Sequence, residues 1–196
     1  MSAAVRWVGD RAALIELDDN PQAVRAARAL AGRRCFVDVV AGHRTVLVTW
    51  AEGPAPDLAV GESAGPEPAA PAVHELGVRY DGPDLGAVAA EARLSPEEVV
   101  ARHVGRDYTV GFLGFQPGFA YLLGLDPRLE VARLDEPRTT VPRGSVGVAG
   151  PYTGIYPRDS PGGWRLLGRT DAVLFDPGRA SPALVAPGDR VRLEAR

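Results

Sequence analysis

Hydrophobic and polar residues alternate along much of the first fifty residues, and this period of two is typical of half-buried β-strands. The alternation predicts strands over Ala3–Val8 and Ala12–Leu17, joined at a Gly-Asp turn, and over Cys35–Val40 and Thr45–Trp50. Between the two pairs, an Asn-Pro start, apolar residues three or four apart and a closing glycine predict a helix over Asn20–Ala31. This order favours a small α+β sandwich in which one helix covers an antiparallel sheet.

The alternation is lost between Ala51 and Ala72. This segment contains five prolines and lacks large apolar residues apart from Leu58 and Val60, so it cannot bury enough surface to offset its ordering entropy. We therefore expect a flexible loop or linker over residues 51–72. A predicted strand follows over Val73–Tyr80, and we expect a first domain over residues 1–80 and a second over residues 81–196.

The second domain is predicted to contain two helices and a series of short strands. A Gly-Pro-Asp turn precedes the helical run Leu85–Ala92, and Ser95-Pro96-Glu97-Glu98 combines an N-cap serine, a first-turn proline and a capping-box glutamate. Short strands at this spacing favour a closed or nearly closed β barrel. The predicted strands are Tyr108–Phe115, Ser145–Ala149, Thr153–Tyr156, Trp164–Gly168, Ala172–Phe175 and Arg190–Leu193.

The composition is that of a soluble globular protein, because 45% of the 196 residues are hydrophobic and 24% are charged. The net charge of −3 argues against a nucleic-acid or anionic-membrane partner that is bound by bulk charge. No apolar segment approaches the length of a membrane span, and residues 1–17 lack the pattern of a signal peptide. Cys35 is the single cysteine and cannot form an internal disulfide, so we expect a cytoplasmic protein.

All 22 basic residues are arginine. The absence of lysine excludes Schiff-base chemistry and a P-loop lysine, so guanidinium groups, hydroxyls or backbone N–H groups must hold any bound phosphate or carboxylate. The three histidines lie in unrelated segments with no second ligand at useful spacing, so we expect no metal site. A nucleophile elbow and a dinucleotide fingerprint are also missing. We interpret Ser145 as a turn hydroxyl and Cys35 as a buried small apolar residue.

Glycines and aromatic residues are interleaved between Tyr108 and Thr170, which hold eight of the thirteen aromatic residues and eleven of the 23 glycines. Glycine permits turns and close approach, so this stretch predicts loops that build a shaped, aromatic surface. Because imidazole titrates near neutral pH, His103 is a candidate proton shuttle, and a hydrogen-bonded helix-terminal histidine is the alternative. The turn Ser160–Trp164 is predicted either to expose the indole of Trp164 or to place that side chain in the core of the barrel. The arginines that could bind an anion are Arg138, Arg143, Arg158, Arg165 and Arg169.

These residues lie within a longer run of motifs that resembles a known family. GFLGFQPGFAYLLGLDPRL, then PRTTVPRGSVGVAGPYTGIYPRDSPGGWRLLGRT and LFDP, are similar to the signature of allophanate hydrolase subunit 1, a family that includes the B subunit of 5-oxoprolinase and the sporulation-kinase inhibitor KipI. The similarity continues upstream through GPDLGAVAAEARLSPEEVVARHVGRDYTV and downstream through PALVAPGDRVRLEAR. It extends more loosely through GDRAALIEL and RTVLVTW, so it covers essentially the whole chain.

The resemblance implies a ferredoxin-like α+β domain followed by a cyclophilin-like β barrel, and a relation to the carboxyltransferase region of urea carboxylase. It implies the B subunit of a multi-subunit 5-oxoprolinase, inactive alone, that cleaves 5-oxo-L-proline to L-glutamate with ATP hydrolysis. The implied partners are a paralogous C subunit, which is like allophanate hydrolase subunit 2, and an A subunit of the LamB/YcsF type; ATP would be bound by them or shared with them. Two alternatives stay open. One is a urea- or allophanate-processing subunit, and the other is a KipI-like module whose aromatic face docks on a histidine kinase.

The family motif carries over onto many residues of this chain. We hypothesise roles for ten of them and for the neighbouring residues Arg143 and Thr170. His103 is the candidate acid or base, and Arg169 or Arg143 would hold anionic oxygen. Together with Arg143, the residues expected to bind substrate are Phe115, Phe119, Tyr121, Ser145, Thr153, Tyr156, Ser160, Trp164 and Thr170.

Two departures from the family pattern bear on these expectations. Tyr152 stands where the G-x-Q-T-G-I-Y pattern has glutamine, so a substrate contact made by that glutamine is in doubt. Residues 51–72 replace what is usually a second helix of the first domain, which puts the helix layer in doubt.

Overall fold

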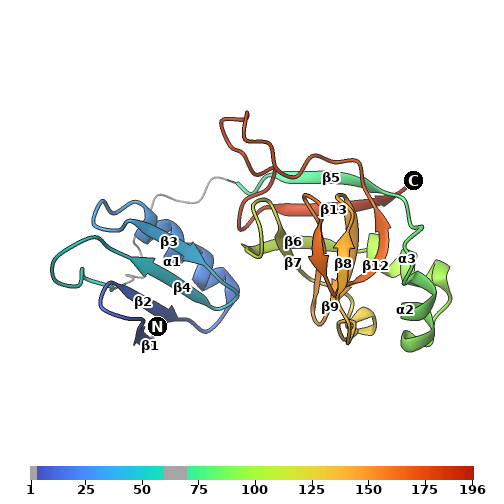
Figure 1. The fold of residues 1–196 in the computed structure, drawn as a ribbon, viewed down its shortest axis with the longest axis horizontal. Helices are drawn as coiled ribbons and strands as arrows, with labels where there is room; N and C mark the ends of the chain where they lie inside the picture. The colour runs from blue at the N-terminus through green and yellow to red at the C-terminus, as the bar shows by residue number, and fades with distance from the viewer. Residues whose placement is uncertain (1–3, 60–69) are drawn as a thin grey trace. The chain divides into compact units, whose positions relative to one another are not determined.

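The structure is a computed structural model that describes residues 4–59 and 70–196 (Figure 1). The chain divides into two compact units, Met1–Pro71 and Ala72–Arg196. The boundary predicted after residue 80 is wrong, because strand β5 (Val73–Val78) pairs in parallel with the last strand of the chain and belongs to the second unit. Of the predicted flexible loop, residues 60–69 lie outside the described residues.

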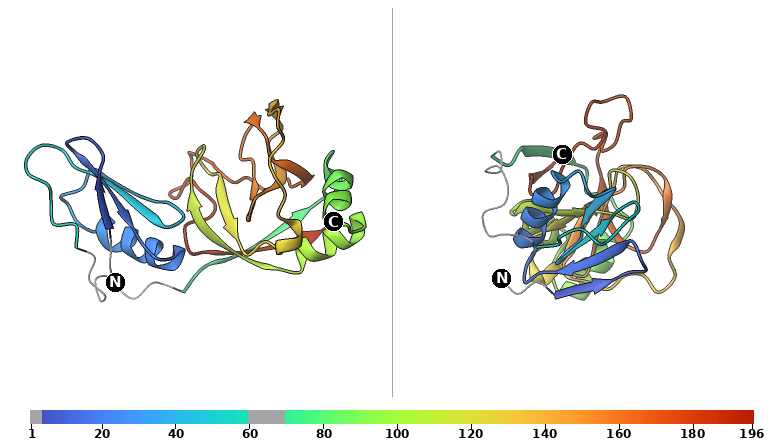
Figure 2. Two further views of the ribbon diagram at one scale, coloured as in Figure 1. Left: turned by 90° about the horizontal axis from the view of Figure 1, so that it is seen from below. Right: turned by 90° about the vertical axis from the view of Figure 1, so that its left-hand side faces the viewer.

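The first unit is a four-stranded antiparallel sheet in the order β1-β2-β4-β3, with one helix packed on it (Figure 2). This confirms the predicted order of two strands, a helix and two strands. The ferredoxin-like arrangement implied by the family is not confirmed, since the described part of this unit contains one helix. The elements are β1 (Ala4–Trp7), β2 (Ala12–Glu16), α1 (Asn20–Ala31), β3 (Asp38–Ala41) and β4 (Thr45–Thr49).

Local sequence explains where α1 begins, although the predicted cap is off by one residue. Asp19, rather than Asn20, is the N-cap, and its carboxylate accepts a hydrogen bond from the Gln22 N–H at 2.8 Å. Asn20 is buried instead, and its amide donates to the His43 carbonyl oxygen at 2.9 Å. Cys35 is exposed, which corrects the expectation of a buried position, because β3 begins only at Asp38.

The second unit is built on a seven-stranded sheet in the order β12-β9-β10-β7-β6-β13-β5 that curls into a barrel-like form (Figure 1). A separate two-stranded sheet pairs β8 with β11. Beyond β5, the elements are α2 (Leu85–Ala92), α3 (Pro96–Val104), β6 (Asp107–Leu113), β7 (Ala120–Leu123), a 3₁₀ turn (Pro127–Leu129), β8 (Arg138–Val141), β9 (Ser145–Ala149), β10 (Tyr152–Ile155), β11 (Ser160–Gly162), β12 (Arg165–Arg169) and β13 (Arg190–Ala195).

Most predicted elements of this unit are confirmed, including both helices and the capping box. Ser95 Oγ accepts from the Glu98 N–H at 3.1 Å, and the Ser95 N–H donates to the Glu98 carboxylate at 2.7 Å. The strand predicted over Ala172–Phe175 is wrong, since this segment forms an isolated bridge from Phe175 to Ala183. β7, β8 and β11 were not predicted. Among the described residues, no helix combines the length and apolar character that a bilayer crossing requires.

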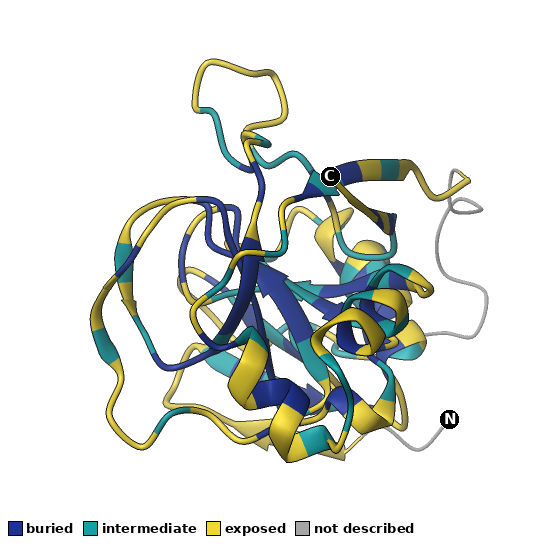
Figure 3. Cartoon of the chain, turned by 90° about the vertical axis from the view of Figure 1, so that its right-hand side faces the viewer, coloured by how far each residue is buried: buried dark blue, intermediate teal, exposed yellow. Residues whose placement is uncertain are grey.

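The barrel closes where its two edge strands meet. Arg79 and Arg169 exchange two backbone hydrogen bonds, of 2.8 and 2.9 Å, and these join the end of β5 to the end of β12. The chain then runs along β12, because the Gly82 N–H donates to the Leu167 carbonyl oxygen at 3.0 Å. The strands surround a core of buried apolar side chains. Buried residues are dark blue along the chain in Figure 3.

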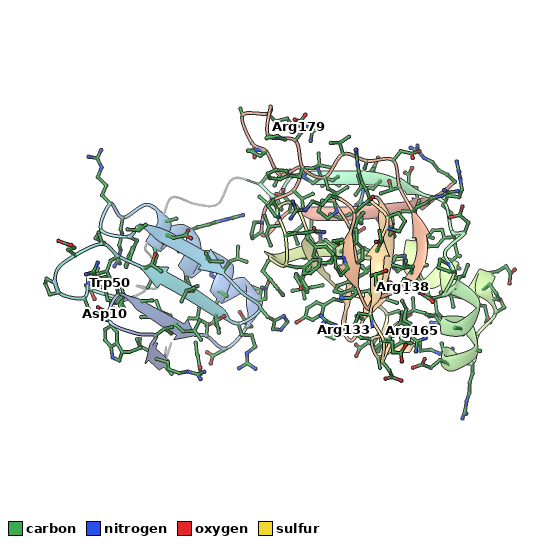
Figure 4. The ribbon with its side chains drawn as sticks, viewed as in Figure 1. Asp10, Trp50, Arg133, Arg138, Arg165 and Arg179 are labelled. Carbon is green, nitrogen blue, oxygen red and sulfur yellow. The ribbon has the colours of Figure 1, made fainter. Side chains whose placement is uncertain are left out.

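Asp84 secures this closure from the start of α2. Its side chain, about 10% exposed, forms an ion pair with Arg138 Nη2 at 2.7 Å. Its second carboxylate oxygen accepts from the Leu166 N–H at 2.7 Å. Asp84 therefore does not cap α2 with its side chain but joins α2 to β12 and to Arg138, which Figure 4 labels.

We predict that Asp84→Ala lowers the free energy of unfolding by about 3 kcal/mol, because it leaves the largely buried Arg138 charge and the buried Leu166 N–H without their partner. Asp81→Ala is the matched control: Asp81 pairs with Arg169, but its side chain is 39% exposed. Loss of that exposed pair should cost less than about 1 kcal/mol. Guanidinium chloride unfolding measures both, and equal losses would contradict this account.

Candidate functional site

Several predicted site residues lie at one end of the barrel, which we call the rim and define as residues 113–119, 142–145, 156–160 and 169–172. Strand pairing places them there, since Ser145 at the start of β9 pairs with Arg169 at the end of β12. Antiparallel pairing with β9 brings the end of β10 to the same place.

The turn Pro142–Ser145 holds the parts of the rim together. The Gly144 N–H donates to the Tyr156 carbonyl oxygen at 2.7 Å, and the Gly144 carbonyl oxygen accepts from the Thr170 N–H at 2.8 Å. Gly144 has φ +80°, and a Cβ there would lie 2.2 Å from the Thr170 oxygen, so no other residue fits. Ser145, the first residue of β9, is buried, and its carbonyl oxygen accepts from the Tyr156 N–H at 2.9 Å.

Gln116 was not among the predicted site residues, but it connects two that were, Arg158 and Ser160. Its side chain is buried, with the residue 9% exposed. Gln116 Oε1 accepts from Arg158 Nε at 2.9 Å, and Gln116 Nε2 donates to Ser160 Oγ at 3.3 Å. The one available signal was its place inside the GFQPGF motif.

Phe115 is the exposed aromatic residue of the rim. It is 60% exposed and has φ +64°, a conformation that is strained for a bulky side chain. Its loop is fixed by hydrogen bonds from the Gln116 N–H to the Gly114 oxygen and from the Phe119 N–H to the Gln116 oxygen.

The broad aromatic face that the sequence predicted is largely core. Phe119, Tyr156 and Trp164 are 1%, 1% and 4% exposed and pack together. The Phe119 ring meets the other two edge-on, with centroids 5.3 and 5.2 Å apart. Burial also raises the pKa of Tyr156. These three side chains therefore support the rim from the core, which corrects the prediction that they contact substrate directly. Trp164 is a core tryptophan, as one of the two interpretations of its turn predicted.

Tyr121 lies beside the rim residue Phe119, with ring centroids 5.1 Å apart, and Tyr152 lies farther along the barrel. Tyr121 is half-buried and stacks on Phe112 with a centroid distance of 4.3 Å. Tyr152 packs edge-on against Tyr121 at 5.4 Å and pairs with Ala149 at the far end of β9. The residue that departs from the family pattern therefore stands at the opposite end of β10 from the rim.

His103 and Thr153 form a hydrogen-bonded chain inside the barrel. Thr153 Oγ1 donates to the Gly147 carbonyl oxygen at 3.0 Å, so it accepts from His103 Nε2 at 2.9 Å. His103 Nδ1 then accepts from the Tyr80 hydroxyl at 2.7 Å. This order assigns the neutral imidazole with its proton on Nε2.

Burial decides the role of His103. The residue is 0% exposed, and burial lowers its pKa from 6.5 to about 3. A neutral, fully bonded imidazole inside the barrel cannot exchange protons with a ligand at the rim. The structure therefore favours the helix-terminal structural histidine over the acid or base, and Thr153 shares that structural role.

A cavity of about 310 Å³ adjoins the rim. Arg169 and Thr170, both predicted site residues, line it, and Arg169 forms an ion pair with Asp81 at 2.7 Å. Its charged and hydroxyl walls are Glu75, Arg79, Arg169, Thr170, Asp171 and Arg196. Within the barrel, by contrast, an apolar void of about 10 Å³ is too small for a ligand.

The arrangement suits anion binding more than metal binding. Guanidinium groups at the rim and in the cavity can form paired hydrogen bonds to carboxylate or phosphate oxygens. Across residues 4–59 and 70–196, no three or more His, Cys, Asp or Glu side chains gather as metal ligands would.

Comparison with known proteins places these observations in a family. The carboxyltransferase domain family, subdomain C and D, matches residues 3–185. The chain is 55% identical over 111 residues to the B subunit of 5-oxoprolinase from Escherichia coli O157:H7, covering 57% of this chain and 51% of that protein. The corresponding protein of Bacillus subtilis (strain 168) is 48% identical over 111 residues, covering 57% of this chain and 46% of that protein. The chain thus spans about half the length of the curated relatives it matches.

Solved structures agree with this fold. The crystal structure of TTHA0988 has a TM-score of 0.81 and 34% identity, covering 95% of this chain and 40% of that chain. The conserved protein PH0987 from Pyrococcus horikoshii has a TM-score of 0.62 and 33% identity, covering 98% of this chain and 97% of that chain. Kluyveromyces lactis urea carboxylase shares the fold, with a TM-score of 0.72 at 21% identity over 99% of this chain and 22% of that chain.

His103 should make stability depend on pH. Between pH 6.5 and about 3 the unfolded state binds the His103 proton and the folded state does not, so stability falls as the pH is lowered through this window. The loss should reach at most about 1.4 kcal/mol per pH unit. His103→Gln should be less stable at pH 7 but should lose less stability between pH 6.5 and about 4.5. Guanidinium chloride unfolding at several pH values tests this, with equal slopes expected above pH 7; a variant that keeps the full acid slope would contradict it.

Proposed function

The chain belongs to the family of carboxyltransferase domains, subdomain C and D, and from that premise we propose that it works as the B subunit of a multi-subunit 5-oxoprolinase. Relatives of that name at 48–55% identity support this assignment. The carrying structural observation is the cavity of about 310 Å³ that Arg169 and Thr170 line, next to a rim that also contains Arg143 and Arg158.

The proposed reaction is the ATP-dependent cleavage of 5-oxo-L-proline to L-glutamate in the cytoplasm. A lactam is a poor electrophile, and phosphorylation of its oxygen would create an electrophilic carbon that water can attack. In this proposal Arg169 holds anionic oxygen in the cavity, and the hydroxyl groups of Ser160 and Thr170 lie within reach of a ligand at the rim. The buried residues His103 and Thr153 support the barrel and take no part in proton transfer.

The proposed partners are a C subunit like allophanate hydrolase subunit 2 and an A subunit of the LamB/YcsF type. The sequence has no lysine and no P-loop, so we assign ATP binding to those proteins or to a site shared with them. The position of the charged groups supports this division, because an exposed rim and an open cavity are surfaces that a second protein can cover.

A second function has one specific observation in its favour. Urea amidolyase of Saccharomyces cerevisiae is 38% identical to this chain over 73 residues, covering 34% of this chain and 4% of that protein. A urea- or allophanate-processing subunit is therefore the alternative, and substrate choice separates the two. The KipI-like alternative loses its main support, because most of the predicted aromatic docking face is buried.

We predict that the complex reconstituted with the A and C subunits releases glutamate from 5-oxo-L-proline only with ATP. Arg169→Gln should lower kcat/KM about tenfold to a hundredfold, as expected for the loss of a charge-assisted hydrogen bond of about 1.5–3 kcal/mol. Arg190→Gln is the matched control, since Arg190 is also exposed and paired, with Asp107 on β6, away from the rim. Full turnover by this chain alone, or ATP hydrolysis driven by urea and not by 5-oxo-L-proline, would contradict the proposal.

A further inference from the structure

Arg158 is held through one nitrogen of its guanidinium group, which leaves the two terminal nitrogens available to a ligand. Its Nε donates to Gln116 Oε1 at 2.9 Å. Its two terminal nitrogens have no hydrogen-bond partner among residues 4–59 and 70–196. These terminal N–H groups are the ones that grip a carboxylate in a paired, end-on geometry.

The Ser160 hydroxyl is oriented by the same amide. Ser160 Oγ accepts from Gln116 Nε2 at 3.3 Å, so its own proton is free to point elsewhere. Since Arg158 and Ser160 bind the two ends of one amide group, the guanidinium and the hydroxyl are neighbours. Both then present donors to the same region of the rim.

Nearby groups add an apolar surface to these donors. The neighbouring carboxylate, Asp159, keeps its charge but accepts from the Arg143 N–H at 2.7 Å, which holds its side chain toward the Pro142–Ser145 turn. Phe115 precedes Gln116 and exposes 60% of its surface from a rigid, strained loop. Its ring offers an apolar surface beside the donors.

Gln116 suits this task for a chemical reason. A buried side chain with one acceptor and one donor satisfies both Arg158 and Ser160 without cancelling the arginine charge. Glutamate in its place would neutralise that charge, and leucine would leave both partners unoriented.

We propose that Gln116 is a positioning residue that holds Arg158 and Ser160 as a carboxylate subsite, with Phe115 packing against the rest of the ligand. The inference deepens the proposed function and rests on it for the ligand: the carboxylate is that of 5-oxo-L-proline. Arg158 and Ser160 bind this group, which does not react, while the lactam lies toward the cavity that contains Arg169.

The test compares 5-oxo-L-proline with 2-pyrrolidinone, which has the same ring without the carboxylate. Binding to the full chain is followed by ¹⁵N–¹H NMR titration. The wild type should bind 5-oxo-L-proline at least about tenfold more tightly than 2-pyrrolidinone, as expected for one charge-assisted contact. Arg158→Gln and Gln116→Glu should bring this ratio close to one, and Arg158→Lys should keep part of it.

Two further variants make the result specific. Phe115→Ala should weaken both ligands equally, because it removes an apolar contact and no charge. Arg190→Gln should leave the ratio unchanged. A folding check by circular dichroism accompanies each variant, and the isosteric Gln116→Glu keeps the test decisive if Arg158→Gln is unstable. A wild type without preference for the carboxylate, or an Arg158→Gln variant that keeps the preference, overturns the subsite.

Turnover separates this inference from the proposed function. In the reconstituted complex, Gln116→Glu should raise KM for 5-oxo-L-proline about tenfold or more with a smaller change in kcat, because the carboxylate does not react. A chain that binds the carboxylate through Arg158 but whose complex releases no glutamate would reject the 5-oxoprolinase function and keep the subsite. If the Gln116→Glu complex is active and its KM for 5-oxo-L-proline is unchanged, the subsite is rejected and the 5-oxoprolinase function is kept.

Discussion

The backbone closure between Arg79 and Arg169 is the constraint on which the rest of the second unit depends. β5 lies at one edge of the sheet and β12 at the other, and this bridge joins them. The approach is possible because glycines stand on both sides: a Cβ at Gly82 would lie 2.3 Å from the Leu166 oxygen, and one at Gly168 would lie 2.2 Å from the Arg79 oxygen. Arg79 and Arg169 also line the cavity, so the backbone contact that closes the barrel positions two residues of the cavity wall.

The polar chain inside the barrel adds a second constraint of a different kind. Tyr80, His103 and Thr153 come from the segment after β5, from α3 and from β10, and each bond in the chain has one direction. The Tyr108 hydroxyl also donates to the His103 carbonyl oxygen at 2.7 Å and ties the end of α3 to β6. A fully satisfied buried network fixes the register of the elements it joins, because any shift would leave a polar group unpaired. The histidine that the sequence marked for chemistry is therefore part of the support beneath the rim.

How much of this the sequence could predict depends on the range of the interactions involved. α3 was predictable because its cap and its capping box lie within four residues, and β9 because its apolar run is bounded by glycines. The sequence could not predict that β5 belongs to the second unit, since its partner strand β13 begins more than a hundred residues later. β8 and β11 lack the apolar pattern of a strand, and the role of Gln116 depends on contacts 42 and 44 residues away. For His103 the sequence left two roles open, because residue type shows that a group can titrate, whereas burial decides whether it does.

The Pro142–Ser145 turn joins the two parts of the rim to which we assign anion binding. On one side the Arg143 N–H holds Asp159, next to Arg158 and Ser160, and on the other Gly144 accepts from the Thr170 N–H, next to Arg169. Because the turn bonds to both segments through backbone groups, the spacing between Arg158 and Arg169 is set by main chain and not by flexible side chains alone. With both arginines bound to the ligand, as proposed, this surface selects ligands that carry negative charge at two separated positions. A lactam acid that gains charge on its ring oxygen during reaction is such a ligand, because its carboxylate is permanent and its second charge appears only as the reaction proceeds.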